Sequence, residues 1–144
     1  MTKRIAIPEQ TIAVLLDSAE SEVEELLREI ESWKGNLEGA SMEHLPKYDE
    51  VAGCYEALET ARDILQAAVE DARLLPAEIL AVPLAMKAIP GRHRSRGRRL
   101  AGVQADLDAV CKDLRERGGM ASVCDDLETA ITEMEQVDFP GMYS

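Results

Sequence analysis

The chain has 144 residues, of which 46% are hydrophobic and 3% aromatic, and its formal net charge is −12. This length suits one domain with a continuous core, and the apolar fraction excludes wholesale disorder despite the charge. Leucine and alanine dominate, while the residues that favour strands are scarce, so the composition predicts an all-α fold. We expect a five-helix bundle that forms a single domain over residues 1–144.

The first half of the chain predicts a long antiparallel helical hairpin. Apolar residues recur at spacings of three and four, and Pro8 suits the first turn of a helix. We therefore expect the first helix at about 8–34, with Gly35 and Asn36 ending it. A second apolar stripe predicts a helix at about 46–73. Two helices of similar length with a modest connection form a hairpin.

The second half predicts a short connector and a pair of helices. Pro76 opens an almost wholly apolar segment that Pro83 breaks or kinks, and its simplest interpretation is burial under the other helices. Gly118 and Gly119 separate the last two helices, and Ser122 is the expected N-cap of the final one. The expected elements are the kinked segment at 76–89, a basic loop at 90–96, and helices at about 97–117 and 122–137.

No motif in the sequence indicates a catalytic, metal or cofactor site. The two histidines, His44 and His93, belong to no Glu-x-x-His or His-Glu-x-x-His pattern, and neither a phosphate-binding loop nor a nucleophile elbow occurs. Cys54, Cys111 and Cys124 lack the close pairing of a zinc site or redox motif, so we interpret them as core residues. We expect a non-enzymatic protein that needs no cofactor.

Acidic residues line one stripe on each of the first two predicted helices. The stripes consist of Asp17, Glu20, Glu24 and Glu31 on the first helix and of Glu56, Glu59, Asp63 and Glu70 on the second. Acids one turn apart lie about 5–6 Å from each other, which is close to the phosphate spacing of a nucleic-acid strand. The stripes are therefore either a solvated surface that aids solubility or an anionic decoy for the nucleic-acid channel of another protein.

An arginine cluster interrupts the acidic chain. It consists of Arg92, Arg94, Arg96, Arg98 and Arg99. Guanidinium groups bind phosphate or carboxylate, so the cluster predicts pairing with acidic stripes of the same chain or of a second copy, or binding of an external anion. Direct nucleic-acid binding is less favoured, because no aromatic residues interleave for base stacking and the acidic flanks repel a polyanion. Docking on a membrane surface through residues 74–89 and the arginines is a further alternative.

The charge pattern favours inhibition of a nucleic-acid-handling protein as the function. In general character it resembles the small acidic helical inhibitors that phages and mobile elements encode, although no motif identifies a family. The alternatives are a regulatory module that binds nucleic acid or phosphate through residues 92–99, and a helical scaffold or homodimerisation domain. We expect a cytoplasmic location, since we find neither a signal peptide nor an apolar run near the ~20 residues that span a bilayer.

Overall fold

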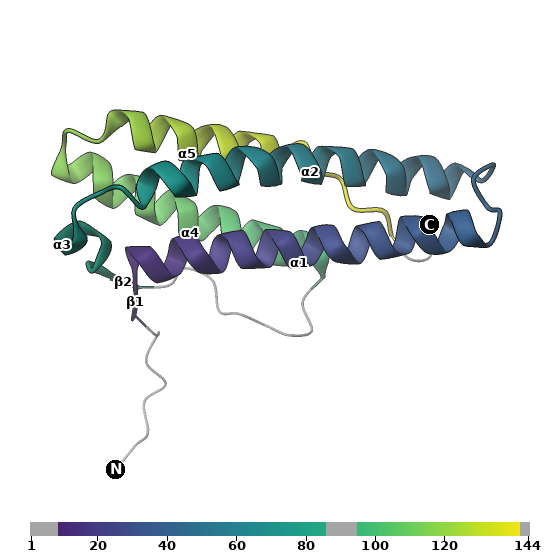
Figure 1. Ribbon diagram of the computed structural model, residues 1–144, viewed down its shortest axis with the longest axis horizontal. Coiled ribbons are helices and arrows are strands. Elements are labelled where there is room, and N and C mark those ends of the chain that lie inside the picture. Colours follow the sequence, from purple (N-terminus) through teal and green to yellow (C-terminus); the bar gives the residue numbers. More distant parts are fainter. Residues whose placement is uncertain (1–8, 86–94, 142–144) are drawn as a thin grey trace, which may run out of the picture.

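A computed structural model of the chain describes residues 9–85 and 95–141. Its elements are β1 (Glu9–Thr11), α1 (Ile12–Gly39), α2 (Pro46–Ala72), α3 (Ala77–Leu80), β2 (Pro83–Ala85), α4 (Arg96–Arg117) and α5 (Ala121–Met134). The predicted all-α bundle is confirmed, with its N-terminal hairpin, short connector and C-terminal helix pair (Figure 1). No helix in the described part of the chain is long and apolar enough to span a membrane.

The four long helices form a ring around one apolar core. Helix α1 packs against α2 and α4, and α5 packs against the same two helices from the opposite side. Neighbouring helices in this ring run antiparallel, while α2 and α4 run in the same direction on a diagonal (Figure 1). Leucine, valine and alanine fill the core, and no polar or charged residue in the described segments is buried. The charged side chains therefore meet along the outer seams between helices.

The first helix begins and ends later than the sequence predicts. Residue Thr11 caps α1, because its side chain accepts a hydrogen bond from the Val14 backbone N–H at 3.2 Å. Just before this cap, β1 pairs antiparallel with β2, so a helix start near Pro8 is wrong. The predicted stop at Gly35 is also wrong. Helix α1 continues to its last residue, Gly39, because Leu37 still packs against the core.

The remaining boundaries lie close to those predicted, with two differences. Helix α5 begins at Ala121, so Ser122 lies inside the helix instead of capping it, and the helix ends at Met134 rather than at the predicted 137. The reversal before α5 is made by Gly118 and Gly119, whose φ angles of 79° and 78° suit glycine. The connector forms a single short helix, α3, and then the strand β2. Residues 86–94, which include part of the kinked segment and most of the basic loop, lie outside the described residues.

The α1–α2 hairpin is longer than the C-terminal helix pair. Helices α1 and α2 have 28 and 27 residues, whereas α4 and α5 have 22 and 14. Helix α5 therefore stops beside the middle of α2, and residues 135–141 continue along the hairpin without forming a helix (Figure 1). We call this segment the C-terminal strap.

Candidate functional site

Two arginines at the start of α4 are bound to carboxylates of α1. The Arg96 Nε donates to the Glu29 Oε1 at 3.0 Å. Arg99 donates from Nη1 to both oxygens of Glu29, at 3.1 and 2.8 Å, and from Nε to Glu22. The side chains of Arg99 and Glu29 are only 19% and 28% exposed. The predicted pairing within the same chain therefore occurs for these two arginines, although their partners lie outside the predicted stripes.

The surroundings of Arg99 stabilise its charge. Burial alone would lower the pKa of Arg99, but the hydrogen bonds that it donates to Glu22 and Glu29 more than offset this effect, so the pKa is raised. Charge-assisted guanidinium–carboxylate hydrogen bonds are stronger than neutral ones. The α1–α4 seam is thus held by paired charges as well as by the core.

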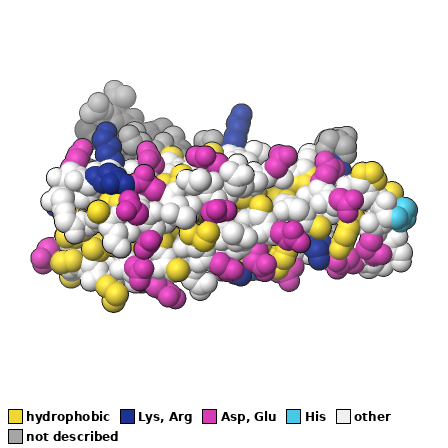
Figure 2. All heavy atoms as spheres, turned by 90° about the horizontal axis from the view of Figure 1, so that it is seen from above, with side chains coloured by type: hydrophobic (Ala, Val, Ile, Leu, Met, Phe, Trp, Pro, Cys, Tyr) yellow, Lys and Arg dark blue, Asp and Glu magenta, His cyan; other side chains and the backbone are white. Residues whose placement is uncertain are grey.

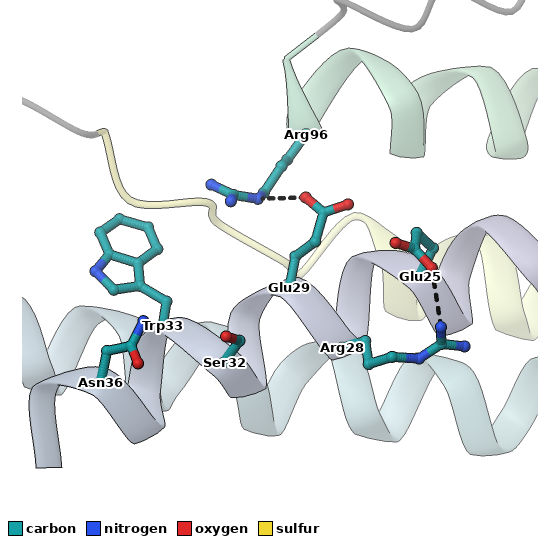
Figure 3. A pocket seen from close by; sticks show the side chains of 7 residues that line it. All are labelled: Glu25, Arg28, Glu29, Ser32, Trp33, Asn36 and Arg96. Atoms are coloured by element: carbon teal, nitrogen blue, oxygen red, sulfur yellow. Dashed lines mark hydrogen bonds and ion pairs between the residues drawn. The ribbon is translucent and has the colours of Figure 1, made fainter. Parts of the chain in front are cut away.

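A groove lies along α1 where α4 begins (Figure 3). It has a volume of about 690 Å³ and is lined by Glu25, Arg28, Glu29, Ser32, Trp33, Asn36 and Arg96. The Arg96 guanidinium lies 5.6 Å from the centre of the Trp33 ring, which is a cation–π contact. The charged side chains that line the groove compensate one another, since Arg28 pairs with Glu25 at 3.1 Å and Arg96 pairs with Glu29. The groove therefore presents no net charge to a ligand.

The rest of the arginine cluster is divided. Arg98 is exposed and forms no ion pair with any described residue; its backbone N–H donates to the Ser95 hydroxyl that caps α4. Arg92 and Arg94 lie outside the described residues. Of the three predicted anion-binding arginines that the structure describes, only Arg98 thus keeps its guanidinium free for an external partner.

The predicted acidic stripe of α1 is mostly neutralised by α2. Arg73 donates to the Asp17 carboxylate at 2.7 Å and to Glu20 at 3.1 Å, and Arg62 donates to Glu24 at 2.9 Å. Glu31 is exposed and has no ion pair within the described segments. Three of the four predicted residues therefore stabilise the hairpin instead of presenting free charge.

The predicted stripe of α2 remains largely unpaired. Glu56 and Glu70 are exposed and take part in no ion pair with a described residue. Glu59 accepts a hydrogen bond from the Tyr55 hydroxyl at 3.1 Å, and this bond raises the pKa of Tyr55. Only Asp63 meets a cation, its neighbour Arg62 at 2.7 Å. The two predicted stripes thus have different environments.

Acidic residues of α5, which the sequence did not single out, extend the α2 stripe. Asp126 and Glu133 are half-buried on the side of α5 turned toward α2, as Arg115 of α4 pairs with Asp125 and Glu128 on the other side. Neither forms an ion pair among the described residues. The sequence does contain a pattern that indicates an acidic C-terminal region, since residues 118–144 contain six acids and no lysine, arginine or histidine.

Together these residues make the exposed surface over α2 and α5 acidic. We define the α2–α5 acidic face as Glu56, Glu59, Asp63, Glu70 and Asp71 of α2 with Asp126 and Glu133 of α5. Figure 2 looks onto these two helices and shows carboxylates along the whole length, with far fewer lysines and arginines. An acidic surface of this kind attracts cations. Within the described residues no cluster of histidine, cysteine or acidic side chains could hold a metal ion.

Comparison of the chain with protein-family models, curated proteins and solved structures found no match.

Proposed function

We propose that this protein is a non-enzymatic inhibitor whose α2–α5 acidic face occupies the nucleic-acid-binding surface of another protein. The observation that carries this proposal is the contrast between the two predicted stripes. Three of the four α1 acids pair with Arg62 or Arg73, whereas only one of the four α2 acids, Asp63, pairs with a described cation, and that cation is Arg62. On the side of α5 turned toward α2, Asp126 and Glu133 form no ion pair among the described residues either. Charges that are unpaired in the free protein remain available to a cationic partner.

The dimensions of the face suit a strand of nucleic acid. Glu56 and Glu70 are separated by fourteen helical residues, which is about 21 Å along the helix axis. Measured along the axis of a double helix, one strand has a phosphate every ~3.4 Å, so roughly six phosphates would span the length over which the α2 stripe presents four carboxylates. A basic channel built for such a strand would meet carboxylates over the same length, and the contacts would exclude nucleic acid by occupying its site.

The alternative, a module that binds nucleic acid or phosphate through residues 92–99, has less support. Arg96 and Arg99 would have to leave Glu22 and Glu29, and breaking half-buried charge pairs costs more than losing exposed ones. The free guanidinium of Arg98 is the observation that keeps this alternative open. The third candidate function is that of a plain helical scaffold, which gives no role to the unequal ion pairing of the two acidic stripes.

The test is a pull-down with the tagged full chain from nuclease-treated host lysate, followed by elution with a synthetic oligonucleotide. The proposal predicts that a stoichiometric nucleic-acid-handling protein is retained and that the oligonucleotide releases it. Retention of a protein that nucleic acid cannot release contradicts occupation of its nucleic-acid site. Recovery of nucleic acid itself, only when nuclease is omitted, favours the arginine cluster instead.

A further inference from the structure

The C-terminal strap, residues 135–141, lies where the bundle changes from four helices to two. Helix α5 ends at Met134, while α1 and α2 continue beyond that level (Figure 1). Val137 and Phe139 of the strap pack against the buried core, and the strap's end is fastened by a hydrogen bond of 2.8 Å from the Lys47 Nζ to the Gly141 carbonyl oxygen. The strap therefore takes the place of a further turn of helix over the hairpin.

Beyond the end of α5, the strap crosses apolar surface of the hairpin beside the N-terminal end of α4, where Arg96 lies over Trp33. We call this surface the distal strip and define it by Trp33 of α1 and Cys54 of α2, the two residues that the strap passes. Cys54 is only 3% exposed, and the charge of Asp138 in the strap acts on its thiol. Figure 3 shows the strap passing next to Trp33. The strap thus supplies part of the cover over Cys54.

The strap meets this surface through an alternating pattern. Val137 and Phe139 are half-buried, whereas Asp138 between them is exposed. A non-helical segment places successive side chains on opposite sides, so the pattern is that of a peptide lying along an apolar surface. Val137, Phe139 and the hydrogen bond from Lys47 to Gly141 hold the strap to the hairpin, and its first residues bond only to the last turn of α5 in the described part of the chain. Each of the four long helices, in contrast, buries a full stripe. Such weakly held segments open without unfolding of the whole domain.

We propose that the C-terminal strap is a releasable internal ligand, and that the distal strip is a docking site for an extended segment with two apolar side chains two residues apart. The strap is the occupant in the free protein, and its own contacts define what can replace it: a partner segment of the same apolar–polar–apolar pattern. This site lies apart from the α2–α5 acidic face, so it does not depend on the inhibitor proposal.

The three buried cysteines provide the measurement, because all are free thiols and only Cys54 lies under the strap. The test variant is the full chain with both Val137→Ser and Phe139→Ser. A maleimide should label Cys54 in this variant at least about tenfold faster, because the two half-buried side chains together bury about as much apolar surface as one fully buried side chain. Labelling of Cys111 and Cys124 should not change. The matched control is Gln136→Ser, which alters an exposed residue of the same strap without changing a charge near Cys54.

A synthetic peptide with the sequence of residues 134–141 then tests the docking site. Added to the double variant, it should slow the labelling of Cys54, and the same peptide with serine at both apolar positions should not. Unchanged Cys54 labelling in the double variant overturns the claim that the strap covers it. Faster labelling that the peptide fails to slow overturns the docking site.

A second measurement covers the case in which the double variant loses its fold and all three cysteines react. In the unaltered chain, the labelling rate of Cys54 should rise less steeply with urea than the rates of Cys111 and Cys124, because release of the strap exposes less surface than unfolding. Equal urea dependence of all three cysteines would mean that Cys54 is reached only by global unfolding, and the proposal fails.

Discussion

The α1–α4 seam and the α2–α5 acidic face cover the same apolar core. In the seam the surface charges pair with opposite charges, whereas on the face most acids meet no described cation. In the seam, Arg96 and Arg99 lie against Glu22 and Glu29, and the partners are largely shielded from water. On the face, acids of both helices lie near one another with Arg62 as the single described cation that meets them. The fold therefore pairs opposite charges in the seam and leaves most of the described acids of the face without a cation.

This difference separates charges that stabilise the protein from charges that do not. A half-buried guanidinium–carboxylate pair stabilises the folded state, whereas like-charged neighbours on a helix destabilise it by a few tenths of a kcal/mol per pair. The acids of α2 and α5 without a described cation thus cost stability. In our proposal, their role is to bind a cationic surface.

The largest expected effect concerns the buried thiols of the core that lies under both regions. It tests whether the core excludes water from these thiols. Burial raises the pKa of the Cys54 thiol from 9.0 to about 11 and that of the Cys111 thiol to about 12. Because the unfolded thiols ionise first, the unfolded state is favoured as the pH rises from 9 toward 11 and 12. The free energy of unfolding should fall by roughly 3 kcal/mol for one such thiol, measured by urea unfolding. Replacing the three cysteines with alanine should make the free energy of unfolding depend less on pH in this range. An equally steep fall in the variant would contradict the explanation by thiol ionisation.

An intermediate effect sharpens the contrast within the arginine cluster. Arg99→Ala leaves Glu22 and Glu29 half-buried without their main donor, so we expect it to lower the free energy of unfolding by about 2 kcal/mol. Arg98→Ala is the matched control on the same turn of α4, and its effect should stay within about 0.5 kcal/mol. Chemical denaturation of both variants measures the difference. Equal costs would show that the α1–α4 pairs contribute no stability.

The smallest effect has opposite signs in the two regions. Glu56→Gln removes a like-charge neighbour of Glu59 and should stabilise the fold by about 0.2–0.5 kcal/mol at low salt. Glu29→Gln removes a partner of Arg96 and Arg99 and should destabilise it. Thermal melts at low and high salt separate the two, since salt screens exposed repulsion more than half-buried pairs. A destabilising Glu56→Gln would contradict the view that the α2–α5 acidic face is electrostatically strained.

Local patterns predicted the fold well because helices are encoded by nearby residues. The apolar spacing located the four long helices, and Pro46 marked the start of α2 correctly. The errors arose where distant residues compete with a local signal. Thr11 replaced Pro8 at the start of α1 because the preceding residues pair with β2, some seventy positions later in the chain. Helix α1 continues beyond the expected end at Gly35 because Leu37 packs against the core.

The candidate site was less predictable than the fold for the same reason. The acidic stripes followed from helical periodicity, but their availability depended on which basic residues the fold brought near them. Nothing local in the sequence pairs Arg73 with Asp17, since they are 56 positions apart and meet only when the hairpin closes. The contribution of Asp126 and Glu133 likewise requires α5 to lie beside α2.

The most direct test compares the two stripes in one binding experiment with the captured partner. Glu56, Asp63 and Glu70 are replaced by lysine in one variant, and Asp17, Glu20 and Glu24 in the other, so that both lose the same number of acids. Binding is measured by calorimetry at two salt concentrations, after circular dichroism shows both variants folded. The account predicts that the α2 variant loses binding and that the α1 variant keeps the larger part of it. Equal loss in both, or binding retained by the α2 variant, would contradict the account.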